Sequence, residues 1–262
     1  MSEGKNVIEV KNLRAVVHEE GQDITLLHDS SFVVREGESL GILGESGSGK
    51  STTGRVLAGL LKPDSGAVLI EGEDVYAGSK GREHLRNRLS IVFQDYTTSA
   101  NPRFTIRRVI GEGIAVGARK TGEKIDYAEE TARLLRLVGL DESFAKRFPH
   151  ELSGGQLQRV CIARAIACRS ELILFDEAVS SLDAHTQVQI MDLLLDLKEK
   201  LGLTYIFITH DLTSITYFCS RVIFLKDGSV VADSPVSELS KLDVPYAKEL
   251  LGAVLDFNAE SA

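Results

Sequence analysis

The chain has 262 residues, of which 43% are hydrophobic and 26% are charged, and its formal net charge is −8. This composition supplies enough apolar material for a sizeable core and excludes a mostly disordered chain, while the acidic balance argues against a broad electrostatic grip on nucleic acid. The three cysteines form no CxxC pair, which does not support a disulfide scaffold or a zinc ribbon.

Hydrophobic periodicity along the chain predicts strands and helices in alternation. Expected strands cover 7–17, 26–34, 39–43, 67–72, 89–94, 171–177 and 204–211, and a hairpin covers 222–234. Expected helices follow the strand 39–43 and then cover 106–148, 153–168, 187–202 and parts of the tail from about residue 237. Strand–loop–helix units at both ends predict an α/β core with a largely parallel sheet, interrupted by a helical subdomain at about 96–152.

Two absences bear on location. The chain contains no run of about 18 apolar residues, so no membrane-spanning helix is expected. The first residues, MSEGKNVIEVKNL, have no apolar segment typical of a secretory signal. We therefore expect a chain that stays in the cytosol and meets a membrane only through a partner.

A glycine-rich loop connects the expected strand 39–43 to the next helix. It reads Gly44-Glu45-Ser46-Gly47-Ser48-Gly49-Lys50-Ser51 and matches G-x-x-x-x-G-K-[ST] in the required strand–loop–helix setting. Glycines let backbone N–H groups turn inward around phosphate oxygens, and the helix N-terminus adds partial positive charge. In this pattern the lysine reaches the β- and γ-phosphates and the serine hydroxyl binds Mg²⁺. The predicted nucleotide-binding residues here are Gly44, Glu45, Ser46, Gly47, Ser48, Gly49, Lys50, Ser51 and Thr52.

An acidic pair ends a second apolar strand. Four apolar residues, 172–175, precede Asp176 and Glu177. Asp176 is placed to hold Mg²⁺ or its water shell, and Glu177 to polarise the attacking water. Two solvent-facing acids at a strand exit are the simpler interpretation of this segment alone, and the glycine-rich loop makes the catalytic one stronger.

A third motif, Leu152-Ser153-Gly154-Gly155-Gln156, is followed by LQRVCIARA. With this motif set between the glycine-rich loop and the acidic strand, the chain resembles the ATP-binding cassette (ABC) ATPases over about residues 7–235. The resemblance implies an α/β P-loop NTPase fold with a RecA-like core, an antiparallel β subdomain and an inserted α-helical subdomain. It implies an ABC ATPase domain over 1–235 and a short helical tail over 236–262.

The resemblance also implies a shared active site. In the family the Ser-Gly-Gly motif binds the γ-phosphate of a nucleotide held by the partner's glycine-rich loop, because it forms a second helix N-terminus. One chain then cannot complete a site, and a head-to-tail dimer is implied. The residues that carry this expectation are Ser153, Gly154, Gly155 and Gln156.

Three single residues match further family positions. Gln94 corresponds to the glutamine that senses Mg²⁺ and the attacking water, so the implied metal set is Ser51, Gln94 and Asp176. Asp183, in Ser180-Ser181-Leu182-Asp183, corresponds to the loop that joins the two active sites. His210, after the strand TYIFIT, corresponds to the histidine that contacts the γ-phosphate and holds Glu177 in line. A strand-end polar residue, a helix N-cap and a structural histidine are the respective alternatives.

The chain departs from the family at the adenine platform. No aromatic residue precedes Phe32, which itself fits a strand core. His18 is the candidate to stack on adenine, and Val17 is the alternative for a plain apolar contact. Loss of an aromatic stack costs about 1 kcal/mol, so we expect GTP to be tolerated better than in relatives that carry the aromatic.

The segment after Gln94, DYTTSANPRFTI, is similar to the peptide/nickel import ATPases. Asp176-Glu177-Ala178 looks more like the nickel-type second ATPase, and no cysteine follows Cys219, so no iron–sulfur cluster is expected. The implied protein is an ATP- and Mg²⁺-dependent motor on the cytoplasmic face of the membrane. Its implied partners are two permeases and a sister ATPase, with a solute-binding protein acting indirectly and no nucleic acid.

Three other readings remain at this point. The first is the ATPase of another transporter class, and the second is a non-transport ABC ATPase that acts on DNA or ribosomes. The third is a module that binds nucleotide without hydrolysing it. Segment 95–105 argues against the first, the acidic single cassette against the second, and the presence of both Glu177 and His210 against the third.

Overall fold

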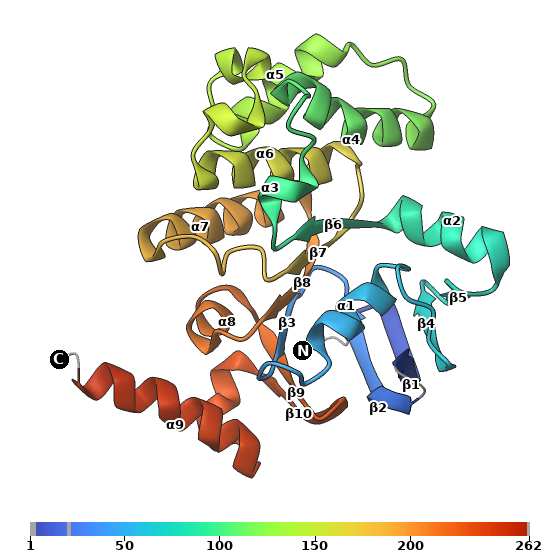
Figure 1. Ribbon diagram of the computed structural model, residues 1–262, viewed down its shortest axis with the longest axis vertical. Coiled ribbons are helices and arrows are strands. Elements are labelled where there is room, and N and C mark those ends of the chain that lie inside the picture. The colour runs from blue at the N-terminus through green and yellow to red at the C-terminus, as the bar shows by residue number, and fades with distance from the viewer. Residues whose placement is uncertain (1–3, 20–21, 261–262) are drawn as a thin grey trace. The chain divides into compact units, whose positions relative to one another are not determined.

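The computed structural model describes residues 4–19 and 22–260. The chain divides into two compact units, one formed by Met1–Arg86 with Thr204–Ala262 and the other by Asn87–Leu203. Each unit is built from both strands and helices, and Figure 1 labels them in chain order. The expected alternation of strands and helices is confirmed in both.

The first unit contains an antiparallel sheet in the order β2-β1-β4-β5. Its strands are β1 (Asn6–Glu19), β2 (Gln22–Arg35), β4 (Ser65–Ile70) and β5 (Glu73–Asp74). In β1, Ile8, Val10, Leu13 and Ala15 are buried, with register shifts against β2 on either side of Leu13. This near-alternation is what a sheet with one buried face requires, and the expected antiparallel β subdomain is confirmed.

The same unit contains parallel strands whose central member is β3 (Ser39–Leu43). All five residues of β3 are buried, as expected for a short apolar strand covered on both faces. It pairs in parallel with β8 (Thr204–Thr209) and with β9 (Arg221–Lys226), and β9 turns back into antiparallel β10 (Ser229–Pro235). The hairpin expected over 222–234 is therefore confirmed, with Asp227-Gly228 between its strands.

Helices of the first unit follow its strands. They are α1 (Lys50–Leu57), α2 (Gly78–Arg88), α8 (Leu212–Phe218), the 3-10 helix η3 (Val236–Lys241) and α9 (Pro245–Glu260) (Figure 1). The sequence did not indicate α2, because its only buried residues are Gly81 and Leu85 and it therefore has no apolar stripe. Both residues pack closely against glycine or backbone. Leu85 lies over Gly59, where a Cβ would be 2.5 Å from the leucine side chain, and a Cβ on Gly81 itself would lie 2.2 Å from the Asp74 carbonyl oxygen.

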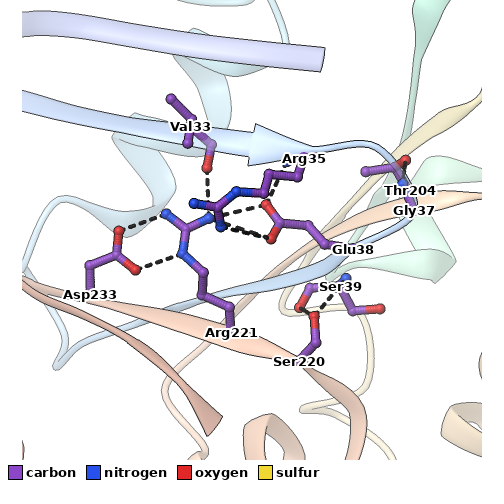
Figure 2. A network of polar contacts seen from close by, with 9 residues as sticks. All are labelled: Val33, Arg35, Gly37, Glu38, Ser39, Thr204, Ser220, Arg221 and Asp233. Carbon is purple, nitrogen blue, oxygen red and sulfur yellow. Dashed lines mark hydrogen bonds and ion pairs between the residues drawn. The ribbon is translucent and has the colours of Figure 1, made fainter. Parts of the chain in front are cut away.

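A polar network joins β2, β3, β9 and β10 at the start of β9 (Figure 2). The Arg221 guanidinium donates two 2.6 Å hydrogen bonds to the Asp233 carboxylate. It also donates to Glu38 at 3.1 Å and to the Val33 carbonyl oxygen at 3.0 Å. Because Arg221 is 8% exposed, these bonds replace its hydration and tie β2, β10 and the turn before β3 to one side chain of β9.

The second unit contains the parallel pair β6 (Leu89–Phe93) and β7 (Leu172–Asp176) and a set of helices. The helices are α3 (Tyr96–Ser99), α4 (Ile106–Thr121), α5 (Tyr127–Leu137), η1 (Glu142–Lys146), η2 (Pro149–Glu151), α6 (Gly154–Ala167) and α7 (Ala184–Leu201). The helical stretch expected over 106–148 is thus three helices with breaks.

Two glycines let α4 approach α6 closely. A Cβ on Gly113 would lie 2.2 Å from the Arg164 carbonyl oxygen, and one on Gly117 would lie 2.4 Å from the Ala167 carbonyl oxygen. Gly113 and Gly117 are one helical turn apart, so they form one side of a close helix crossing. Within 4–19 and 22–260, every helix is too short or too polar to cross a membrane.

Candidate nucleotide-binding and hydrolysis residues

The phosphate-binding loop, Gly44–Ser51, takes the backbone conformation that only its glycines permit without strain. Gly47 has φ +83° and Gly49 has φ +100°, both in the region that L side chains rarely adopt. Gly49 is also the N-cap of α1, so the loop leads directly into a helix N-terminus. A glycine-rich turn that leads into a helix N-terminus suits an anionic ligand such as a polyphosphate.

Lys50 lies across this loop and is 5% exposed. Its ammonium donates to the carbonyl oxygens of Gly44 and Glu45, each at 2.7 Å. These two hydrogen bonds hold the Lys50 ammonium inside the phosphate-binding loop. Ser51 is exposed in the first turn of α1, whereas Thr52 is buried. The hydroxyl of Ser51 is a hard oxygen donor of the kind that Mg²⁺ prefers.

Residues from the end of β9 onward support the loop from behind. A Cβ on Gly44 would lie 2.3 Å from the Leu225 carbonyl oxygen, so only glycine fits there. The Gly228 N–H donates to the Ser48 carbonyl oxygen at 3.0 Å. A Cβ on Gly49 would lie 2.9 Å from the Leu26 carbonyl oxygen, which places a second backbone against the loop. The loop conformation is therefore fixed by the backbone around it.

His210 leaves the sheet at the same edge as the phosphate-binding loop. In the parallel pairing of β3 with β8, Leu43 lies opposite Thr209. Gly44 and His210 are the next residues of the two strands, and His210 is exposed. The first unit therefore brings these two predicted elements to one strand edge, as parallel pairing dictates.

The second unit brings Gln94 and the acidic pair together in the same way. Phe93 lies opposite Asp176 in the parallel pairing of β6 with β7, so Gln94 and Glu177 follow at one edge. The Gln94 amide donates to the Ser180 hydroxyl at 3.4 Å, and that hydroxyl donates to the Glu177 carbonyl oxygen at 2.9 Å. Ser180 thus links the two residues through hydrogen bonds.

Glu177 has an unusual backbone. Its φ is +47°, in the left-handed region that costs a residue with a side chain about 1–2 kcal/mol. Buried Ala178 and Val179 follow it directly, and the Ser180 N–H donates to the Glu177 carbonyl oxygen at 3.2 Å. Strain of this kind persists where the surroundings fix it, and it is concentrated at functional sites.

The Ser-Gly-Gly-Gln motif forms the N-terminus of α6. Ser153 is the N-cap, and it exchanges hydrogen bonds with Gln156 in a capping box. A Cβ on Gly154 would lie 2.5 Å from the Tyr96 hydroxyl, and one on Gly155 would lie 2.5 Å from the Thr186 side chain. Both glycines therefore allow neighbours to pack against the helix start.

Asp183 is the N-cap of α7 and joins this cluster. Its carboxylate accepts from the Thr186 N–H at 2.9 Å and from the Thr186 hydroxyl at 2.7 Å. These hydrogen bonds hold the pKa of Asp183 below its ordinary value. Because Thr186 also lies against Gly155, the second unit links Asp183 to the Ser-Gly-Gly motif through one side chain.

Two residues remain to be compared with the sequence predictions: His18, which was predicted to contact adenine, and Tyr246, which was not predicted. The side chain of His18 lies outside the part of the chain that the structure describes, so its predicted role stays a prediction. Tyr246 was missed: its hydroxyl accepts a 3.0 Å hydrogen bond from the Glu45 N–H in the phosphate-binding loop. No local pattern signals a contact between residues 201 positions apart.

A strand–loop–helix with a buried lysine, together with an acidic pair at a parallel strand end, defines a P-loop nucleotide-binding protein. The model of the ABC transporter family matches residues 27–180, and the chain belongs to this family. It is 42% identical to the nickel import ATP-binding protein NikE of Rhodospirillum rubrum over 235 residues, which are 88% of this chain and 83% of that protein. It is 39% identical to the oligopeptide transport ATP-binding protein OppF of Bacillus subtilis over 256 residues, 95% of this chain and 83% of that protein.

A solved structure agrees with these relatives. The ATP-binding cassette MJ0796, in a dimeric post-hydrolysis state bound to ADP and Pi, superposes with a TM-score of 0.77 at 31% identity. The superposition covers 87% of this chain and 98% of that one. The fold is that of an ABC ATPase, and the expected α/β P-loop architecture is confirmed.

Proposed function

We propose that this chain binds and hydrolyses ATP to power an importer for peptides or for nickel-type metal complexes. The observation that carries the ATPase is the phosphate-binding loop closed over the 5% exposed Lys50. Support for import comes from relatives named as nickel import and oligopeptide transport ATP-binding proteins. We assign the cassette to residues 1–235, with the helical insertion at about 96–152, and the tail to 236–262.

In the proposed reaction, water attacks the γ-phosphorus of ATP and the bond to the β-γ bridging oxygen breaks, giving ADP and phosphate. Lys50 and the loop N–H groups bind the phosphate oxygens, and Glu177 accepts the proton of the attacking water. The strained backbone at Glu177 and the Ser180 hydrogen bonds support a fixed carboxylate direction. His210 contacts the γ-phosphate, and Gln94 orients the water.

Mg²⁺ fits the donors that this chain offers. Ser51, Gln94 and Asp176 carry hydroxyl, amide and carboxylate oxygens, which are the ligands that Mg²⁺ prefers. When bound, the ion neutralises charge on the phosphate oxygens.

The active unit in this proposal is a dimer with a sister ATPase or a second copy. Ser153, Gly154, Gly155 and Gln156 then contact the nucleotide held by the partner's loop, and Asp183 lies near the dimer interface. The capped α6 N-terminus supports this role, because it presents backbone N–H groups to an anion. The dimeric state of MJ0796 with ADP and Pi is consistent with it.

Two permeases complete the proposed importer, and an extracytoplasmic solute-binding protein acts through them. The chain then lies on the cytoplasmic face of the membrane and is held there by the permeases. ATP closes the dimer and hydrolysis reopens it, because the closed state binds ATP more tightly than ADP. Membrane association only on co-expression with the permeases is the expected result, whereas association without them contradicts this arrangement.

The Glu177→Gln variant tests the assigned reaction. It keeps the size of the side chain and removes the base, so ATP binding stays while hydrolysis falls by about 10²–10⁴-fold. Glu171→Gln is the matched control, because Glu171 is an exposed glutamate that directly precedes the same strand and pairs with Arg88. Hydrolysis in the control stays near wild type. Near-normal turnover in Glu177→Gln refutes the role of Glu177.

Uptake measurements test the cargo. Native cells that carry Glu177→Gln in place of the wild-type gene receive labelled nickel and a labelled dipeptide in separate assays. Loss of uptake of one and not the other identifies the cargo class. If uptake of both is unchanged while the purified chain hydrolyses ATP, the ATPase stands and the peptide/nickel assignment is wrong.

A further inference from the structure

Tyr246 lies near the start of α9, in the C-terminal tail, and its hydroxyl contacts the phosphate-binding loop. It accepts the Glu45 N–H at 3.0 Å and donates to the Leu225 carbonyl oxygen over 3.5 Å. The residue is 5% exposed, and the Lys226 ammonium lies 4.8 Å from the ring centroid. A long side chain of the tail is thus buried against the loop and the strand end that supports it.

The bond from Tyr246 acts on a peptide group that also binds Lys50. The Glu45 N–H and the Gly44 carbonyl belong to the same peptide group, which is planar, so fixing one direction fixes the other. The N–H points to the Tyr246 hydroxyl at 3.0 Å. The carbonyl oxygen accepts the Lys50 ammonium at 2.7 Å. One rigid plane therefore connects the tyrosine hydroxyl to the lysine charge.

Two features of the surroundings bear on this peptide plane. Glu45 is exposed, so solvent can reach the loop at this point. Gly44 has no side chain, and its Cα faces the Leu225 carbonyl oxygen closely enough that a Cβ would lie 2.3 Å away. The tyrosine hydroxyl bridges the Glu45 N–H and that same carbonyl, which ties the loop entry to the end of β9.

The phenol keeps its proton in this setting. Burial, together with the nearby carboxylates of Glu45, Asp227 and Glu249, raises the pKa of Tyr246 above its ordinary value, although the Glu45 N–H acts in the opposite direction. A protonated hydroxyl can donate to one carbonyl while it accepts one N–H, as the two observed contacts require.

We infer that Tyr246 is a positioning residue for ATP binding: through the peptide between Gly44 and Glu45 it sets the place of the Lys50 ammonium. The C-terminal tail is then part of the nucleotide site, although it lies beyond the residues 27–180 that match the family model. The inference rests on the proposed role of Lys50 in binding phosphate.

Tyr246→Phe is the direct test, because it removes the hydroxyl and keeps the ring that packs under Lys226. The dissociation constant of a fluorescent ATP analogue, mant-ATP, is measured on the full chain. It is expected to rise about 2- to 10-fold, the range that one hydrogen bond accounts for. The amide hydrogen of Glu45 is expected to exchange faster with solvent.

Tyr76→Phe is the matched control in the same unit. The Tyr76 hydroxyl is half-buried and lies 2.5 Å from the Val56 carbonyl oxygen and 2.7 Å from the Leu61 carbonyl oxygen, at the end of α1 opposite Lys50. Its loss lowers the melting temperature but leaves the mant-ATP affinity and Glu45 exchange unchanged. An affinity loss in the control equal to that in Tyr246→Phe shows a general stability effect and overturns the inference.

A double-mutant cycle with Lys50→Ala separates the inference from the proposed function. If Tyr246 acts through Lys50, Tyr246→Phe changes mant-ATP affinity in the wild-type background and not in the Lys50→Ala background. Equal changes in both backgrounds, or none in the wild type, overturn the inference while the phosphate-binding loop stands. Unchanged affinity in Lys50→Ala alone overturns the proposed loop function itself.

Discussion

Replacement of Arg221 by methionine tests what holds the first unit together. Arg221 is 8% exposed and makes a two-bond pair with Asp233, and the Glu38 side chain is 10% exposed. Methionine fills similar space but leaves Glu38 as a buried charge that has lost its closest cation. Removing one member of a buried pair costs about 3–5 kcal/mol. Because the Asp233 side chain is 42% exposed and water compensates it, we expect the lower end, about 3 kcal/mol.

The measurement is thermal unfolding without nucleotide at one protein concentration. For a chain of this size about 1 kcal/mol shifts the midpoint by about 2–4 °C, so a loss of about 6–12 °C is expected. Arg221→Lys keeps the charge and loses the two-bond geometry, so it should lie between the wild type and Arg221→Met.

A second substitution identifies the cause of the loss. Glu38→Gln removes the charge while its amide oxygen can still accept the Arg35 N–H, which now donates to Glu38 at 2.6 Å. Alone, Glu38→Gln should destabilise, because Arg221 loses a partner. In the Arg221→Met background it should restore part of the lost stability, because it removes a buried charge whose remaining cation, the Arg35 guanidinium, lies 3.8 Å away. An unfolding midpoint of Arg221→Met within 2 °C of wild type refutes this reasoning. So does a Glu38→Gln substitution that lowers the midpoint in the Arg221→Met background as it does in the wild type.

Further predictions concern the phosphate-binding loop, the N-cap of α3 and the recognition of adenine. Gly49→Ala should lower the melting temperature more than Gly47→Ala: both positions need a positive φ, but only at Gly49 would the Cβ meet backbone, at 2.9 Å from the Leu26 carbonyl oxygen. Asp95 caps α3 by accepting from Thr97 and Thr98, which lowers its pKa from 3.8 to about 2. The stabilisation is therefore complete above about pH 4 and is lost as the pH falls through about 2. A carboxyl-carbon NMR titration measures this pKa, and Asp95→Asn abolishes the pH dependence because an amide does not titrate in this range. KM values for ATP and GTP should be comparable, and a large preference for ATP contradicts the expected weak adenine contact.

The sequence predicts the parts of the site that depend on strand ends. Parallel strands end at one edge, so residues that directly follow β3 and β8, or β6 and β7, come together once those strands pair. The family resemblance points to Gln94 and His210, and the strand pairing explains why His210 follows its strand beside Gly44 and Gln94 follows its strand beside Glu177. The glycine-rich loop is equally local, because its conformation requires glycine at fixed positions.

What the sequence does not predict depends on tertiary context. Helix α2 has a mostly polar sequence and is held by Leu85 against Gly59, a contact that periodicity does not reveal. The positive φ of Glu177 is likewise invisible, since glutamate is not a residue that favours this region. The contact of Tyr246 with Glu45 joins residues 201 positions apart, and no motif in the tail indicates it.

Strand β9 connects the stability of the first unit to its phosphate-binding loop. Its first residue, Arg221, binds β2, β10 and the turn before β3, and Leu225, next to its last residue, lies against Gly44 and Tyr246. The two lie four residue steps apart in an extended strand, about 13 Å, so the strand is held at both ends over a short span. The loop needs a fixed backbone to hold Lys50, and that backbone rests on a strand whose other end is fixed by a buried ion pair. Evolutionary or engineered changes at Arg221 should therefore appear in nucleotide affinity as well as in stability.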